Sequence, residues 1–180
     1  MIAVNKSAVF LIGFMGSGKT TTGKKLAAKL GLQFVDLDAE IVRQSEFNSI
    51  AEMEAARGMD YFREAERDVL QRMDVAGKLI STGGGAPCYF NNLEWMKSRG
   101  VIVYLEMDEK SIYNRLKQTN LEERPLLKGM NDEQLREFIT TKLQERRPFY
   151  ELADVVFNPV REGVEELASL LKHKLPPKLC

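Results

Sequence analysis

Residues 13–20, Gly-Phe-Met-Gly-Ser-Gly-Lys-Thr, fit the pattern G-x-x-x-x-G-K-[ST] of a phosphate-binding P-loop. The apolar run at residues 8–12 precedes the motif and predicts a buried strand. Residues 19–30 carry apolar side chains at helical spacing, and Gly31 is a suitable helix stop. The motif therefore lies between a strand and a helix N-terminus, and this context predicts nucleotide binding.

The residue types of the motif suit the chemistry of a bound triphosphate. Gly13, Gly16 and Gly18 let backbone N–H groups turn inward without side chains in the way. The helix that follows directs the positive end of its dipole toward the same anion. Lys19 is expected to reach the β- and γ-phosphates, and the Thr20 hydroxyl is a suitable ligand for Mg²⁺.

Strand and helix signals alternate along the rest of the chain. This alternation predicts one α/β domain over residues 1–180, built around a parallel sheet with right-handed crossovers. The further strands are expected at residues 33–36, 78–81, 101–105 and 155–157. The further helices are expected at residues 38–45, 49–58, 60–73, 92–98, 108–118, 132–148 and 164–174, with Asp60, Asp108 and Asp132 as caps.

Composition narrows the class of protein. The 26 basic and 26 acidic residues balance, so nothing indicates a nucleic-acid partner or an anionic membrane surface. No run approaches the roughly 20 apolar residues of a membrane span, and no secretory signal is recognised. The two cysteines, Cys88 and Cys180, form no disulfide framework. We expect a cytoplasmic enzyme that acts as a monomer, with no nucleic-acid or membrane partner.

Two carboxylates follow the second expected strand, in Phe-Val-Asp-Leu-Asp at residues 34–38. Their period-two spacing directs both side chains the same way while the strand persists. The C-terminal edge of a parallel sheet is also where the P-loop lies. In the functional interpretation, Asp36 binds a water molecule that is bound to Mg²⁺. Asp38 binds the hydroxyl group of the molecule that accepts the phosphoryl group. The alternative, that Asp38 is only a helix N-cap, remains open at this stage.

Three glycines, Gly83 to Gly85, follow the third expected strand. Such a run costs folding entropy, so a close approach of a ligand to the backbone is the favoured explanation. A plain loop is the alternative. Since this strand lacks the terminal acid that many P-loop proteins use for the metal, Asp36 is the expected substitute.

Several arginines occur in sequence contexts where their side chains could face the same cleft. Arg63 lies near the start of an expected helix, and Arg146 and Arg147 precede a proline. Arg124 lies in a polar segment at about residues 118–131, which is typical of a mobile lid. The planar guanidinium fork suits carboxylates and phosphates.

Together these motifs resemble those of the shikimate kinase family. The resemblance rests on the P-loop followed in order by F-V-D-L-D, F-R in a helix, G-G-G, R-P-L-L and R-R-P-F-Y, and it extends from Ala8 to about Glu166. It implies a three-layer P-loop kinase fold with a five-stranded parallel sheet flanked by helices. It also implies a substrate-binding segment at about residues 37–66 and a closing lid.

The resemblance further implies ATP-dependent, Mg²⁺-requiring phosphorylation of the 3-hydroxyl of shikimate. The residues implied as catalytic are Lys19, Asp38 and Arg124. Those implied to contact ATP are Gly13, Gly16, Ser17, Gly18, Lys19, Thr20, Thr21 and Arg124. Those implied to contact shikimate are Asp38, Arg63, Gly83, Gly84, Gly85 and Arg146. Thr20, and Asp36 through a water, are implied to hold the metal.

Some assignments stay open on the sequence. The adenine-stacking arginine of the family falls at Arg115 or Lys117, and a second adenine loop would lie near residues 158–161. The R-x-P-x-Y pattern selects Arg146 over Arg147. Another small-molecule or nucleoside-monophosphate kinase is the rival enzyme, and a non-catalytic nucleotide-binding module is the rival from another class.

Overall fold

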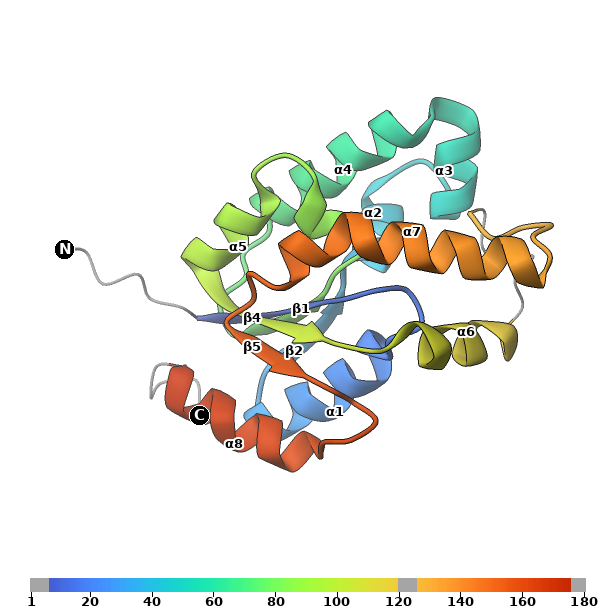
Figure 1. Cartoon of the computed structure of the whole chain (residues 1–180). Coiled ribbons are helices and arrows are strands. Elements are labelled where there is room, and N and C mark those ends of the chain that lie inside the picture. Colours follow the sequence, from blue (N-terminus) through green and yellow to red (C-terminus); the bar gives the residue numbers. More distant parts are fainter. Residues whose placement is uncertain (1–6, 120–125, 176–180) are drawn as a thin grey trace.

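A computed structural model describes residues 7–119 and 126–175 of the chain. In this part of the chain, five parallel strands form a sheet of order β2-β3-β1-β4-β5, as Figure 1 shows. The five-stranded parallel sheet expected from the sequence is confirmed. The strands are β1 (Ala8–Ile12), β2 (Gln33–Asp36), β3 (Lys78–Ser81), β4 (Gly100–Leu105) and β5 (Val155–Phe157).

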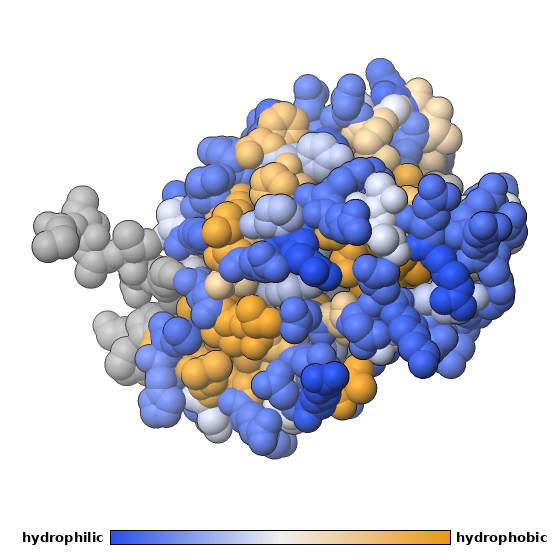
Figure 2. All heavy atoms as spheres, viewed as in Figure 1, coloured by the Kyte–Doolittle hydropathy of each residue, from blue (hydrophilic) through white to orange (hydrophobic). Residues whose placement is uncertain are grey.

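Burial explains why the central strands are apolar throughout. Every residue of β1 and β4 is buried, because helices cover both faces of the sheet. The edge strand β5 alternates instead, and Val156 at its centre is half exposed. Figure 2 shows hydrophilic residues over most of this side of the molecule, with hydrophobic residues gathered over β5 and the neighbouring part of α8.

Helices make the outer two of three layers (Figure 1). Val9 and Leu11 of β1 face α1 and α8, whereas Phe10 and Ile12 face the core shared with α2, α3, α4, α5 and the end of α7. A third cluster joins α6 to α7 beside the P-loop, around Phe14. The helices are α1 (Lys19–Leu30), α2 (Leu37–Gln44), α3 (Ile50–Arg57), α4 (Met59–Arg72), α5 (Asn92–Arg99), α6 (Glu109–Lys117), α7 (Asp132–Tyr150) and α8 (Val164–Lys174).

Topology brings three loops to one edge of the sheet. The P-loop follows β1, Asp36 ends β2, and Gly83 lies just past the end of β3. Because β2, β3 and β1 are neighbours and parallel, their carboxyl ends meet, and ligands of open α/β sheets bind at that edge. No helix in the two described ranges is long and apolar enough to cross a membrane.

Several helix starts differ from the sequence predictions. The N-cap of α2 is Asp36, whose carboxylate accepts from the N–H groups of Asp38 and Ala39, so Asp38 is not the cap. Strand β2 also ends at Asp36, so the alternation argument for Asp38 does not hold. Helix α4 begins after Gly58 rather than at Asp60. In each case two residues that lie two positions apart could begin the helix, and local sequence does not separate them.

The ends of the α7 region also depart from expectation. Its N-cap is Asn131, in a capping box with Gln134, rather than Asp132. Helix α7 continues through Pro148 to Tyr150, because the Tyr150 ring is buried and its hydroxyl donates to the Gly84 carbonyl at 2.6 Å. A short 3-10 helix, η1 (Ala86–Cys88), follows the three glycines and was not predicted.

Candidate active site

The P-loop wraps a space that only glycine backbone can leave open. Gly13, Gly16 and Gly18 have φ of 142°, 79° and 88°, in the region that disfavours other residues. A Cβ on Gly13 would lie 2.8 Å from the Leu105 carbonyl oxygen. The loop leads directly into α1 at Lys19, so the helix N-terminus faces the same space.

Lys19 folds back over the loop that precedes it. Its Nζ donates to the carbonyl oxygens of Gly13 at 2.8 Å and Phe14 at 2.9 Å. This places the ammonium group at the mouth of the loop, where the positive charge is available to an anion held by the backbone N–H groups. Lys19 thus lies against the P-loop, and its contact with the β- and γ-phosphates stays a prediction.

A larger cavity of about 620 Å³ extends from the P-loop. Arg115 lines it, with its Nη1 3.4 Å from the Gly16 carbonyl oxygen. Lys117 instead pairs with Asp132 at 2.6 Å on the surface. Of the two alternatives for the adenine contact, the geometry therefore favours Arg115. The turn at residues 158–161 is not part of the described lining of this cavity.

Thr20 and Asp36 form the candidate metal position. The Thr20 hydroxyl donates to Asp36 Oδ2 at 3.3 Å, and both residues line the larger cavity. The described residues hold no group of three or more His, Cys, Asp or Glu side chains placed so that they could bind a metal ion. One hydroxyl and one carboxylate fit Mg²⁺, which takes oxygen ligands and keeps most of its shell as water and substrate phosphate.

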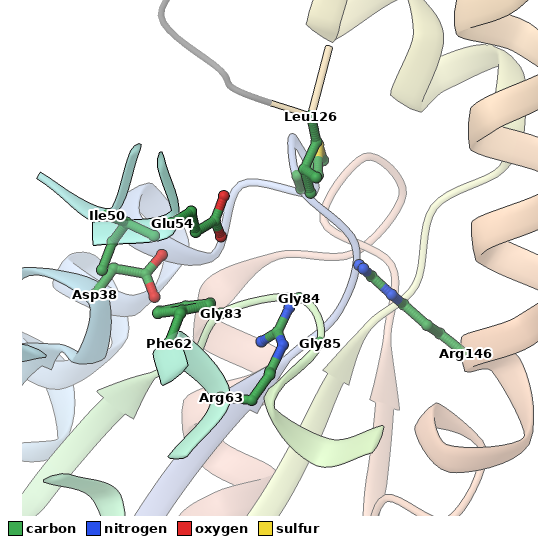
Figure 3. Close-up of a pocket in the computed structure, with 11 residues that line it drawn as sticks. Asp38, Ile50, Glu54, Phe62, Arg63, Gly83, Gly84, Gly85, Leu126 and Arg146 are labelled. Carbon is green, nitrogen blue, oxygen red and sulfur yellow. The ribbon is translucent and has the colours of Figure 1, made fainter. Parts of the chain in front are cut away.

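A second, smaller cavity of about 220 Å³ adjoins the first (Figure 3). In Figure 3, Asp38 and Arg146 approach the three glycines from opposite sides, and Arg63 lies between them. The two cavities share Met15, Asp38, Gly83 and Gly84. The lining of the smaller cavity is Met15, Asp38, Ile50, Glu54, Phe62, Arg63, Gly83, Gly84, Gly85, Leu126 and Arg146.

The three glycines are required by the charged side chains around them. A Cβ on Gly84 would lie 2.9 Å from Arg146 Nη1, and a Cβ on Gly85 would lie 2.6 Å from Arg63 Nη2. On Gly83 it would meet Glu66 Oε1 at 2.7 Å. The sequence predicted a close approach of a ligand to this backbone. In the structure, side chains of the chain itself lie this close, and contact with a ligand stays a prediction.

Arg63 and Arg146 are both buried, with 7% and 8% of their surface exposed, whereas Arg147 is exposed. Arg63 Nη1 donates to Glu66 Oε2 at 2.6 Å. The guanidinium carbon of Arg146 lies 5.5 Å from the centre of the Phe14 ring. Arg63 and Arg146 are thus the two arginines that line the smaller cavity.

Asp38 and Glu66 each have a buried carboxylate oxygen, although Glu66 is fully buried and Asp38 only half-buried. Burial and the nearby Asp36 charge raise the pKa of Asp38, against the lowering effect of Lys19 and Arg63. Burial raises the pKa of Glu66 to about 7, although the Arg63 charge opposes this. Asp38 Oδ1 and Glu66 Oε1 are buried without a hydrogen-bond partner in the described part of the chain. Of the two, Asp38 lines both cavities, whereas Glu66 is fully buried behind Gly83 and lines neither.

Some site residues escaped the sequence analysis. Glu66 follows Arg63 at the i,i+3 spacing of a helical ion pair, which is a signal that could have identified it. Glu54 lines the smaller cavity, and Tyr150 supports Gly84 from α7. No local signal distinguishes Glu54 from the exposed Glu52 of the same helix, because its position depends on tertiary packing.

Two features beside the site are the segment expected to form the lid and the cysteine Cys88. Arg124 lies outside the described residues, so its position is not given by the structure. Of the expected lid segment, Leu126 lines the smaller cavity and Leu127 is buried between α6 and α7. Burial raises the pKa of the Cys88 thiol to about 11, so it is not an activated nucleophile.

Comparison with known proteins places this geometry in a family. A family model described as shikimate kinase matches residues 15–175. The chain belongs to the shikimate kinase family. The shikimate kinase of Parabacteroides distasonis is 44% identical over 151 residues, covering 83% of this chain and 86% of that protein.

Solved structures agree with this assignment. A crystal structure of shikimate kinase from Bacteroides thetaiotaomicron matches with a TM-score of 0.83 and 37% identity, over 93% of this chain and 97% of that one. A structure of shikimate kinase from Acinetobacter baumannii in complex with shikimate matches with a TM-score of 0.78 and 33% identity, over 97% and 96% of the two chains. The family assignment and the fold thus rest on sequence and structure together.

The raised pKa of Glu66 predicts a pH-dependent stability. Because the folded-state pKa of about 7 exceeds the ordinary 4.5, the folded state holds this proton more tightly. The contribution of Glu66 to the free energy of unfolding is therefore present below pH 4.5 and lost as the pH rises through 7. Relative to Glu66→Gln, the wild type should lose on the order of 2 kcal/mol between pH 5 and 8 in urea unfolding.

The matched control is Glu64→Gln, which removes an exposed acid two residues away on the same helix. The difference in unfolding free energy between the wild type and this control should not change with pH. Parallel curves for the wild type and Glu66→Gln would contradict the raised pKa.

Proposed function

We propose that the chain transfers the γ-phosphoryl group of ATP to the 3-hydroxyl of shikimate, giving shikimate 3-phosphate and ADP. It thus acts as a phosphotransferase with an alcohol group as acceptor, in the pathway to chorismate and the aromatic amino acids. The observation that carries the proposal is the wall shared by the two cavities, at Asp38, Gly83 and Gly84. An acceptor in the smaller cavity would lie directly beside the phosphates held by the P-loop.

The smaller cavity has the chemistry of a polyhydroxylated carboxylic acid. Arg63 and Arg146 supply two buried guanidinium groups for one carboxylate, and Asp38 and Glu54, which also line this cavity, supply acceptors for hydroxyl groups. The relative from Acinetobacter baumannii was solved in complex with shikimate. The carboxyl groups of Asp38 and Glu54, which line this cavity, disfavour a phosphorylated acceptor such as a nucleoside monophosphate, because like charges would meet in a desolvated site.

Enzymes catalyse phosphoryl transfer mainly by positioning the reacting groups and neutralising their charge. Each residue role proposed below is therefore one of positioning or of charge neutralisation. Asp38 would orient the acceptor hydroxyl and accept its proton, and its raised pKa suits a base that must hold that proton. Lys19, with Arg124 from the lid expected at about residues 118–131, would balance the charge of the transferring group. The residues proposed to hold ATP through the P-loop are Gly13, Gly16, Ser17, Gly18, Lys19, Thr20 and Thr21.

Thr20 and Asp36 would hold Mg²⁺, the hydroxyl directly and the carboxylate through a water. When bound, the ion neutralises charge on the β- and γ-phosphates. Asp36 also caps α2 with its other oxygen, which fixes the carboxylate against Thr20. We further propose that the chain acts as a monomer in the cytoplasm, with neither nucleic acid nor membrane as a partner, in keeping with its zero net charge.

The test of this function is an assay that couples ADP release to NADH oxidation with a panel of acceptors. Shikimate should exceed gluconate and AMP in kcat/KM by at least about 100-fold, because two arginines and two acids must be matched at once. Comparable turnover with AMP would establish the rival nucleoside-monophosphate kinase. ATP binding without turnover of any acceptor would establish a non-catalytic module.

Asp38→Asn tests the proposed role of the carboxylate. An amide of the same shape cannot accept the proton, so kcat should fall by about 100-fold or more. The Kd for ATP should stay within a few-fold of the wild-type value, as measured by titration calorimetry. Turnover within a few-fold of wild type would remove Asp38 from the chemistry.

Arg146→Lys and Arg147→Lys form a matched pair of adjacent substitutions. An ammonium cannot reproduce the fork of the buried Arg146, so KM for shikimate should rise about tenfold or more in that variant. Arg147 is exposed, and its variant should stay within about twofold of the wild type. A large effect at Arg147 with none at Arg146 would show that the other arginine binds the acceptor.

A further inference from the structure

One stripe of α4 contacts a short segment that follows the glycine loop. Arg63, Arg67 and Gln71 are spaced four residues apart, so they share one face of the helix. Along this face they meet residues 89–92, called here the 89–92 segment. The guanidinium carbon of Arg67 lies 4.6 Å from the centre of the Phe90 ring, and Gln71 Nε2 donates to the side-chain oxygens of Asn91 at 2.9 Å and Asn92 at 3.1 Å.

Arg63 meets the first residue of this segment. Its guanidinium carbon lies 4.5 Å from the centre of the Tyr89 ring and 4.8 Å from the centre of the Phe62 ring. Both distances are within the range of a cation–π contact. Tyr89 is 42% exposed, so its ring does not belong to the apolar core. The contact with Arg63 gives this exposed ring a function.

The backbone of the 89–92 segment is held in one place. Phe90 has φ of 52°, a conformation that is a clear outlier for a bulky residue and persists only where the surroundings impose it. Asn92 is fully buried, and its Nδ2 donates to the Ala86 carbonyl at 3.0 Å. The Tyr89 ring is thus presented to Arg63 from a fixed support.

Arg63 requires such support. Glu66 holds one end of its guanidinium group through Nη1, while Nε has no partner in the described part of the chain. One hydrogen bond does not by itself fix the plane of the group, and bidentate binding of a carboxylate depends on that plane. The Gly85 backbone and the Phe62 ring pack against the guanidinium group and limit its rotation. The Tyr89 ring, at 4.5 Å, adds a further restriction from the 89–92 segment.

We propose that Tyr89 is a positioning residue for the acceptor, acting through Arg63. The Tyr89 ring fixes the plane of the Arg63 guanidinium group, and the carboxylate of the acceptor binds in that plane. The Tyr89 hydroxyl takes no part. The inference rests on the proposed function, since it takes Arg63 as the carboxylate ligand.

The test compares three variants in the coupled assay. Tyr89→Leu keeps apolar bulk but removes the ring, and it should raise KM for shikimate about tenfold with KM for ATP unchanged. Tyr89→Phe keeps the ring and should stay within about twofold of the wild type. Phe90→Leu is the matched control, because it removes the neighbouring ring from Arg67, which does not line the cavity. It should leave KM for shikimate within about twofold.

The outcomes separate this inference from the proposed function. An unchanged KM for shikimate in Tyr89→Leu, with a raised KM in Arg63→Lys, overturns the role of Tyr89 alone. Equal increases in Tyr89→Leu and Phe90→Leu also overturn it, because they would indicate general anchoring of the loop. If Arg63→Lys leaves KM for shikimate unchanged, the proposed carboxylate ligand itself is wrong. Thermal melting of each variant monitors folding.

Discussion

Arg63, Arg146 and Glu66 lie against the Gly83–Gly85 backbone at distances that leave no room for a Cβ. Two of these side chains are buried cations and one is a buried acid. Removing such groups from water is costly, and a buried ion pair rarely repays that cost by itself. The chain nevertheless retains them at the boundary of a cavity. On the proposed function, a ligand of complementary charge would offset this cost, so these groups serve binding rather than stability.

The parallel sheet makes this concentration of charge possible. Its neighbouring strands end at one edge, and each brings a different group there: the P-loop follows β1, Asp36 ends β2 and the glycines follow β3. Helix α4 then brings Arg63 to the glycines from one side, and α7 brings Arg146 from the other (Figure 3). The order of the strands therefore determines which groups can act together on a transferring phosphate.

Much of the fold was predictable from the sequence, because its signals are local. Apolar runs mark the buried strands, and the P-loop and the glycine run each have a backbone reason that holds without tertiary context. The exact helix starts were less predictable, since Gly58 competes with Asp60 and Asn131 competes with Asp132. The extension of α7 past Pro148 depends on the hydrogen bond from the Tyr150 hydroxyl to the Gly84 carbonyl oxygen, which joins residues 66 positions apart.

Residues of the site could be predicted from the sequence only where they belong to a recognisable motif. Arg115 could not be separated from Lys117 by spacing, because which of them faces the P-loop depends on how α6 packs. The burial of Glu66 and the approach of Tyr89 depend on contacts between α4 and the chain after β3. Long-range contacts of this kind leave no periodic trace in a single sequence.

The most direct measurement of the central claim is a crystal structure of the chain soaked with shikimate and ADP. The carboxylate of shikimate should lie within about 3 Å of the guanidinium nitrogens of Arg63 and Arg146. One hydroxyl group of shikimate should accept or donate a hydrogen bond with the Asp38 carboxyl group and face the P-loop. Shikimate bound with its carboxylate away from both arginines, or outside the smaller cavity, would contradict the account.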